Sequence, residues 1–443
     1  MQKKIIALAV AGLVSGGAFA QSNVTISGQF KVGMDGISAG GATAGAAGNY
    51  TSRTRVVDNN SNIRFSGSEK LGNGMTAVFQ VESALGTDNY DGTASGNIAS
   101  TPATRNATLG SRDTFVGLSG NWGTVALGKH SVHYNSMANV EAAGLADGLA
   151  LVTSSLNVLN TINGATLGGS TRLTNAIAYI SPTWSGFNAM VGYTTLGEST
   201  APGLAKKDNG LNVKLAYNNG PIAATYSYLA VNGAGAAAPG AAGAASVQCS
   251  LTTGAIVTAT DATTCTGSTG VVLSTTAAAA ATTGNGTDVR SNRLGAAYTF
   301  PMGLKVGLIW DKSKNTSKAA VAGDTWTERS AWALPISYRT GAHNFSFTYA
   351  KANSTSADSM PATVAARAAG WDDSAKMTML GYEYSMSKRT SVAVSWTQIN
   401  NERNGVYDFW HPSSNVANAG GALAAGSAGA DPRAFSVNLF HKF

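Results

Sequence analysis

The chain has 443 residues, with 30 Lys and Arg against 23 Asp and Glu, a formal net charge of +7 and only 12% charged residues. Charge is about half as frequent as in a typical soluble protein, which argues against an ordinary water-soluble domain. The positive excess is not gathered into any run of Lys or Arg, so nucleic-acid binding is not expected.

The first twenty residues have the pattern of an export signal. Lys3 and Lys4 give a positive start, an apolar stretch follows over 5–14, and Ala18-Phe19-Ala20 is a small-x-small cleavage site. We expect residues 1–20 to be cleaved and residues 21–443 to form one domain. No run of 18 apolar residues follows, so the sequence predicts no transmembrane helix.

Alternating apolar and polar residues are the main structural signal along the rest of the chain. In the segment 24–34, Val24 and Ile26 share one face of an extended strand while Gln29 and Lys31 share the other. The same alternation recurs over 211–217, 304–311, 344–349 and 435–439. Each of these segments is predicted to be a strand with one apolar and one polar face.

The connections between the predicted strands fall into two classes that alternate. Short turns are predicted at 71–74, 120–123, 181–186, 218–221, 301–303, 340–343 and 387–390. Long loops are predicted at about 36–58, 86–108, 130–170, 196–208, 233–289, 312–328, 353–375 and 400–432. This rhythm predicts an all-β fold, a 16-stranded antiparallel transmembrane β-barrel with short periplasmic turns, long external loops, an apolar outer face and a polar lumen. A soluble β-sandwich or solenoid would explain the alternation but not the two classes of connection.

Aromatic residues with a polar edge stand near many strand ends, as they do where a barrel meets the two membrane interfaces. They include Tyr179, Tyr193, Tyr298, Trp310, Tyr338 and Tyr382.

The segment 233–289 is of low complexity, rich in Ala, Gly and Thr, and is expected to be an external loop. It contains Cys249 and Cys265, which we expect to form a disulfide after export to an oxidising compartment. A flexible linker between two domains is the alternative, although strand patterns of one type flank the segment on both sides. No Cys-x-x-Cys occurs and the five histidines are scattered, so neither a metal nor another cofactor is expected.

Motifs of enzymes are weak or missing. Residues 123–129 imitate a phosphate-binding loop, but His130 stands where Ser or Thr is needed. No Gly-x-Ser-x-Gly and no His-Glu-x-x-His occurs. The chain is not expected to be an enzyme.

Several segments resemble one family, the general-diffusion porins of β-proteobacteria. Residues 112–129 are similar to its fourth strand, turn and fifth strand, and residues 62–75 to its second strand and following turn. The segments 24–28, 175–182 and 438–443 are similar to its first, sixth and terminal strands.

The resemblance implies a homotrimer embedded in outer-membrane lipid and lipopolysaccharide. The third long loop, here about 130–170, would fold into the lumen and narrow it to an eyelet. Small hydrophilic solutes and anions would pass, and the terminal Phe443 would be recognised by the barrel-assembly machinery.

The resemblance also implies which residues form the eyelet, where basic wall residues face acids of the loop. They are Arg64, Arg112, Arg172 and Lys129 on the wall, Lys129 standing where relatives usually have Arg, with Glu141 and Asp147 on the loop.

Strand alternation supports part of this placement. Arg64 lies between two apolar residues that should face lipid, and Arg172 has the parity of Thr174 and Ala176. Arg112 has the parity of apolar residues and would need a bulge or a position outside the lipid zone. A charge facing lipid near the midplane costs about 2–4 kcal/mol, so inward placement is favoured. By the same alternation, further lumen-lining cations are expected at Lys31, Lys214 and Lys305.

The barrel pattern and the resemblance together imply an outer-membrane channel for passive diffusion, and these cations predict a mild preference for anions. Pairing of the arginines with acids such as Glu69 or Glu82 would instead leave little net field. Two other functions stay open: an adhesin or receptor that acts through the long loops, and a solute-specific channel. The latter would need a track of aromatic residues along the lumen.

Overall fold

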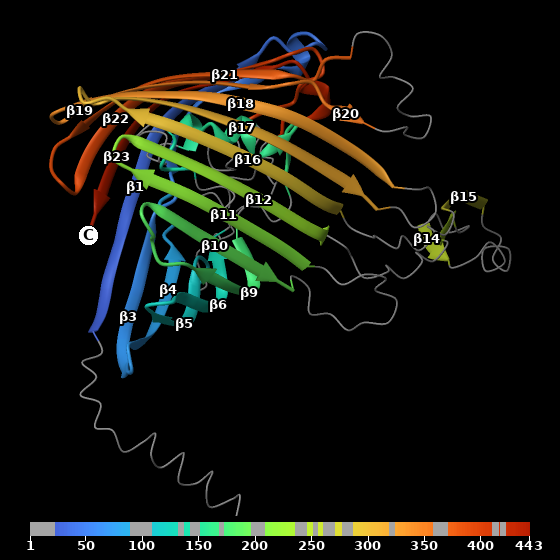
Figure 1. Ribbon diagram of the computed structural model, residues 1–443. Coiled ribbons are helices and arrows are strands. Elements are labelled where there is room, and N and C mark those ends of the chain that lie inside the picture. The colour runs from blue at the N-terminus through green and yellow to red at the C-terminus, as the bar shows by residue number, and fades with distance from the viewer. Residues whose placement is uncertain are drawn as a thin grey trace, which may run out of the picture.

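The computed structural model describes residues 23–88, 109–131, 137–141, 151–167, 172–195, 209–234, 246–250, 256–259, 271–276, 287–318, 324–357, 371–409, 416 and 422–443. Within them, one broad antiparallel sheet closes on itself into a ring of tilted strands (Figure 1). Among the helices of these residues, none has the length and apolarity needed to cross a membrane.

The predicted 16-stranded antiparallel β-barrel is confirmed. The barrel strands are β1 (Asn23–Gly40), β3 (Asn62–Gly72), β4 (Met75–Ala84), β5 (Thr114–Gly120), β6 (Gly123–Ser131), β9 (Arg172–Ile180), β10 (Phe187–Thr194), β11 (Asn209–Asn219), β12 (Ile222–Ala234), β16 (Thr287–Thr299), β17 (Leu304–Ser317), β18 (Thr325–Thr340), β19 (His343–Ala352), β21 (Ala375–Ser385), β22 (Thr390–Asn401) and β23 (Asp431–Lys442). The ring closes where β1 pairs with β23, in register from Gln29 opposite Lys442 to Gly40 opposite Asp431. Closure leaves no unpaired sheet edge, as a lipid environment requires.

The remaining described elements are short. They are β2 (Tyr50–Asp58), β7 (Thr161–Ile162), β8 (Ala165–Thr166), β20 (Ser356–Ala357), the helix α2 (Leu156–Leu159), the 3-10 turns η1 (Ala46–Gly48), η5 (Leu151–Thr153) and η7 (Ala425–Ser427), and a separate three-stranded sheet of β13 (Ser246–Ser250), β14 (Ile256–Ala259) and β15 (Val271–Thr276).

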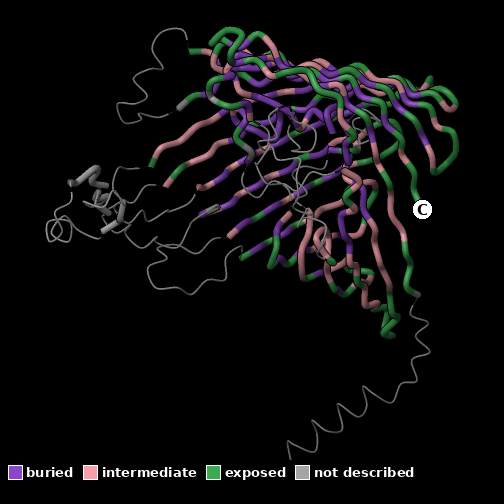
Figure 2. Tube along the Cα trace, turned by 180° about the vertical axis from the view of Figure 1, so that it is seen from behind, coloured by how far each residue is buried: buried purple, intermediate pink, exposed green. Residues whose placement is uncertain are grey.

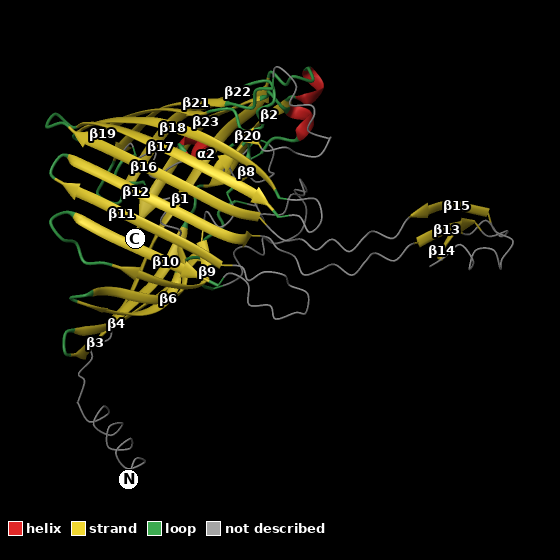
Figure 3. Cartoon of the chain, turned by 45° about the vertical axis from the view of Figure 1, so that its right-hand side comes forward, coloured by secondary structure: helices red, strands yellow, loops and turns green. Residues whose placement is uncertain are grey.

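All seven predicted short turns lie between consecutive barrel strands. Figure 3 shows them at one end of the barrel, with the longer connections at the other. Two predicted long loops are wrong in their bounds. The ladder of β1 and β2 occupies much of 36–58, and β17 and β18 extend into 312–328. There the pairs include Lys314 opposite Glu328 on one face and Ser313 opposite Arg329 on the other, so both faces are polar. Backbone pairing continues beyond the apolar zone, where side-chain alternation no longer marks a strand.

The two faces of the wall follow the predicted alternation in β23. Phe435, Val437 and Leu439 are exposed on the outside, while Ser436 and Asn438 between them are buried on the inside. Figure 2 shows the same change between exposed and buried residues along neighbouring strands. Apolar side chains can therefore meet lipid while polar ones face the lumen.

One part of the inner face departs from the expected polar lining. Where loop residues Val152, Val158 and Leu159 meet β18, β19, β21 and β22, many inward side chains are small or apolar and belong to the same buried cluster as the loop residues. The wall members of this cluster include Ala331, Ala333, Ala350, Ala352, Met377, Met379 and Ile399. Helix α2 packs against β18, β19 and β21. The inner face is apolar here because a loop segment covers it and keeps water from it.

Candidate functional site

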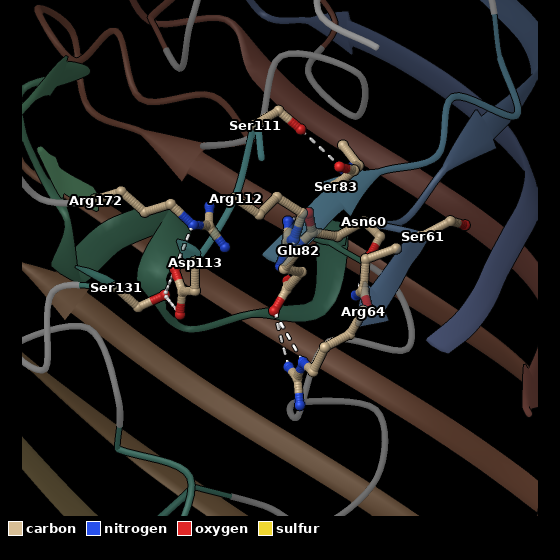
Figure 4. A network of polar contacts seen from close by, with 12 residues as sticks. Asn60, Ser61, Arg64, Glu82, Ser83, Ser111, Arg112, Asp113, Ser131 and Arg172 are labelled. Carbon is tan, nitrogen blue, oxygen red and sulfur yellow. Dashed lines mark hydrogen bonds and ion pairs between the residues drawn. The ribbon is translucent and has the colours of Figure 1, made fainter. Parts of the chain in front are cut away.

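A row of charged side chains lies on β3, β4 and the segment before β5 (Figure 4). Arg64 and Glu82 are direct cross-strand partners in the β3–β4 ladder. Arg64 donates to Glu82 Oε2 from Nη2 at 2.8 Å and from Nε at 3.2 Å. Arg112 donates from Nε to Oε1 of the same carboxylate and from Nη1 to Asn60 Oδ1. Glu82, only 2% exposed, is thus held between two guanidinium groups.

A second ion pair adjoins the first. Arg172 Nε donates to Asp113 Oδ1 at 2.7 Å, and Ser131 Oγ donates to the same carboxylate at 2.8 Å. Arg112 lies in the loop before β5, where burial lowers the pKa of its guanidinium, nearby Arg172 lowers that pKa further and Glu82 raises it. The row thus carries three arginines and two carboxylates, a formal charge of +1.

Strand alternation does not determine the directions of Arg112 and Arg172. Arg112 precedes β5, with its backbone N–H bonded to Glu82 O at 2.9 Å, so the parity of β5 does not apply to it. In β9 the ladder shifts register, Asn175 has a φ of 52°, and Leu173 and Ala176 are both buried although three residues apart. Unbroken alternation from 172 to 176 was therefore the wrong assumption. The Arg172 side chain is oriented by its ion pair with Asp113 and not by its position in the alternating pattern of β9.

The four predicted lysines lie apart from one another. Lys129 Nζ donates to Gly110 O at 3.1 Å, and Lys305 Nζ donates to the backbone carbonyl of Glu141 at 2.7 Å. Lys31 lies with Nζ 5.7 Å from the centre of the Phe440 ring. Lys214 is nearly buried on β11.

One of the two predicted loop acids lies within the described residues and the other does not. The buried carboxylate of Glu141 accepts a 2.7 Å hydrogen bond from Ser155 Oγ, so it is engaged within the loop. Asp147 lies outside the described residues, as does Cys265, so the disulfide with Cys249 is not described. The terminal Phe443 exchanges two 3.1 Å backbone hydrogen bonds with Gly28 of β1 and thereby extends the closing ladder.

The loop is held against the inner wall at its near end. Asn139 contacts Thr225 of β12 at 2.8 Å and Asn218 of β11 at 3.1 Å. Val140 rests over two wall glycines: a Cβ at Gly307 would lie 2.6 Å from Val140 O, and one at Gly295 would lie 3.1 Å from Val140 Cγ1. The missing side chains let the loop backbone approach the wall.

The far end of the loop is held by a buried cluster that sequence reasoning did not identify. Asp311 of β17 accepts hydrogen bonds from Arg293 Nε at 3.0 Å and from Arg329 Nη1 at 2.9 Å, and all three side chains are fully buried. The two arginines also donate to Leu159 O at 2.8 and 2.9 Å. The sequence did contain a signal for this cluster. Leu294 and Trp310 are apolar and face outward, so their neighbours Arg293 and Asp311 must face inward, where their opposite charges can pair.

The contacts at this site are ion pairs and hydrogen bonds among arginines, carboxylates and the Ser131 hydroxyl. Within the described ranges no three His, Cys, Asp or Glu residues are grouped to hold a metal. What the geometry offers is a field of fixed charge along one side of a lumen.

Comparisons with known proteins agree on one family. The model of the Gram-negative porin family matches residues 7–271 and 257–404. An outer membrane porin protein of Bordetella pertussis is 26% identical over 250 residues, 52% of this chain and 60% of the relative. Outer membrane porin protein 32 of Delftia acidovorans is 32% identical over 231 residues, 51% of this chain and 58% of the relative. The chain thus spans about six-tenths of the length of the curated relatives it matches. The anion-selective porin from Comamonas acidovorans has a similar fold, with a TM-score of 0.62, 21% identity and coverage of 96% of this chain and 100% of that one.

Proposed function

We propose that this chain, which belongs to the Gram-negative porin family, forms a water-filled channel for the passive diffusion of small hydrophilic solutes and ions. Its place is the cell outer membrane, where its named relatives are found. The observation that carries the proposal is the closed barrel with an apolar outside and a charged row on the inside. A lumen of that kind conducts without a cofactor, and we propose no enzymatic activity.

The constriction is proposed to form between the arginine row and the loop of about 130–170. The loop segments 137–141 and 151–167 are bonded to β11, β12, β16 and β18. The backbone N–H of Leu151 also donates to Asn59 Oδ1 at 2.9 Å, next to the Asn60 that Arg112 contacts, so the loop reaches the arginine row. Solutes would therefore cross the narrow zone past the arginines, with Lys129, Lys214 and Lys305 adding positive field from the wall.

A mild preference for anions follows from the charge of this row. The alternative that Arg64 and Arg112 pair with Glu82 agrees with the contacts, and this pairing reduces the field without cancelling it, since one positive charge remains. The relative with the similar fold is described as anion-selective, which supports the same sign.

Assembly and export complete the proposal. A homotrimer in lipid and lipopolysaccharide agrees with membership of the family, and a solved outer membrane protein of Vibrio cholerae with a similar fold is described in a trimer form (TM-score 0.55, 11% identity). Residues 1–20 are proposed to direct export, Phe443 to be read by the barrel-assembly machinery, and Cys249 and Cys265 to form a disulfide.

The test is planar-bilayer recording of the refolded full chain across a KCl gradient. Stepwise conductance in groups of three, with a reversal potential that favours chloride modestly, is the expected result. A preference for potassium would refute the selectivity, and a folded barrel without conductance would favour a receptor role for the loops.

A further inference from the structure

A cavity of about 380 Å³ lies at the short-turn end of the barrel. Its walls come from β1, β18, β21, β22 and β23, and Ala138 of the loop segment 137–141 also lines it. Its strand residues take the inward positions of their strands. Glu383, for example, is buried between the outward Tyr382 and Tyr384. The cavity therefore opens to the lumen and not to lipid.

The lining of this cavity is strongly cationic. Lys31, Arg339, Lys388, Arg389 and Lys442 line it, against the single carboxylate of Glu383. Arg339 Nη2 lies 4.0 Å from Glu383 Oε2, which is a long ion pair. Such an excess of positive charge within one concave site attracts an anion.

Two of the ammonium groups lie close to one aromatic ring. Lys442 Nζ is 5.2 Å and Lys31 Nζ is 5.7 Å from the centre of Phe440, which itself lines the cavity. The ring attracts each cation, but the two like charges repel each other. An anion placed between them would remove that repulsion.

A buried hydroxyl provides an observation that does not depend on charge. Ser391 is 3% exposed and lines the cavity, and its Oγ has no hydrogen-bond partner within the described part of the chain. A buried hydroxyl without a partner costs about 1–3 kcal/mol, and a bound oxyanion would accept its proton. Cations alone would attract anions without fixing their position. A neutral hydrogen-bond donor beside the cations would hold an oxyanion in one orientation.

From these observations we infer a second anion-binding site in the lumen, at its short-turn end, for an oxyanion with at least two negative charges. Inorganic sulfate or phosphate and solutes that bear phosphate or several carboxylates share this chemistry. Arg339, Lys442 and Lys31 supply the charge and Ser391 donates a hydrogen bond. The inference rests on the proposed function only for the solute's route into the lumen.

Calorimetric titration of sulfate into the refolded full chain in detergent tests the site without any need for conductance. We expect saturable binding that chloride at the same ionic strength does not reproduce. Arg339→Gln with Lys442→Gln should weaken binding about tenfold, since each exposed charge contributes only a few-fold. Ser391→Ala should weaken it about three- to tenfold.

Matched controls separate a built site from general attraction. Lys376→Gln removes a cation from β21 that does not line the cavity, and Ser395→Ala removes a buried hydroxyl from the same face of β22. Both should bind sulfate as the unmodified chain does. Absence of saturable binding, or equal losses in Ser391→Ala and Ser395→Ala, would overturn the inference.

Bilayer recordings keep this inference distinct from the proposed function. Sulfate added from the short-turn side should reduce the chloride current, and the reduction should weaken in the same variants. Conductance without sulfate binding would refute the sulfate site and support the channel. Sulfate binding without conductance would support the site and refute the channel.

Discussion

Arg329 of β18 donates a 2.9 Å hydrogen bond from Nη2 to the backbone carbonyl of Leu159, at the end of α2. This contact ties a wall strand to a loop segment 170 residues earlier in the chain. The same guanidinium is bonded to Asp311, so one buried side chain links the barrel ladder to the loop that lines it.

Replacement of Arg329 by Met should loosen the loop. It leaves Asp311 with one arginine in a fully buried site and removes a donor from Leu159 O. Loss of one partner from a buried ion pair costs about 3–5 kcal/mol. We expect increased open-channel noise and an earlier thermal transition in detergent. Arg433→Met, which removes an exposed arginine of β23, is the control and should alter neither. Quiet channels in the Arg329 variant would show that the loop does not depend on this contact.

Glu82→Gln should increase the preference for anions. The change raises the formal charge of the arginine row from +1 to +2 without a change of side-chain shape, so the chloride-to-potassium permeability ratio should rise about twofold. Glu69→Gln removes a carboxylate from the exposed end of β3 and should leave the reversal potential unchanged. If both variants behaved alike, the row would not control selectivity.

The double variant Arg64→Ala with Arg172→Ala should have the opposite effect. Loss of two of the three arginines leaves an excess of carboxylate, so the reversal potential should move toward potassium while truncation enlarges the single-channel conductance. Unchanged conductance and selectivity would place these two residues outside the constriction.

Gly307→Ala should displace the near end of the loop. The added methyl group would lie 2.6 Å from Val140 O, so either the loop segment 137–141 or the wall must move, at a cost of about 1–3 kcal/mol. We expect a changed single-channel conductance and a lower unfolding temperature. Gly192→Ala on β10, where no atom lies within 4 Å of the added group, should resemble the unmodified chain. Identical behaviour of the two variants would mean that Val140 does not need the glycine.

The strands and short turns could be predicted because a barrel wall repeats a two-residue pattern and each short turn interrupts it. The strand extensions were missed where both faces of a ladder are polar, as at Lys314 opposite Glu328 and the adjacent Ser313 opposite Arg329. Inward alanines such as Ala331 and Ala333 are compatible with either a wet or a covered surface, so their burial under the loop was not encoded in alternation.

The charged row was predicted in part. Arg64 lies inside an undistorted stretch of β3, so its parity was informative. Arg172 lies beyond a register shift that no local residue pattern announced, and Asp113 gains its partners only when β6 and β9 assemble beside it. Contacts between a strand and a distant loop segment, such as Arg293 with Leu159, depend on loop placement and could not be predicted from local sequence.

Swelling of liposomes that contain the refolded full chain tests most directly whether the lumen is an open, unselective water path. Uncharged sugars report passage independently of ion selectivity. Swelling rates should fall smoothly with increasing sugar size and should not saturate with sugar concentration. Absence of swelling with the smallest sugars, or saturation by one sugar alone, would contradict a general diffusion channel.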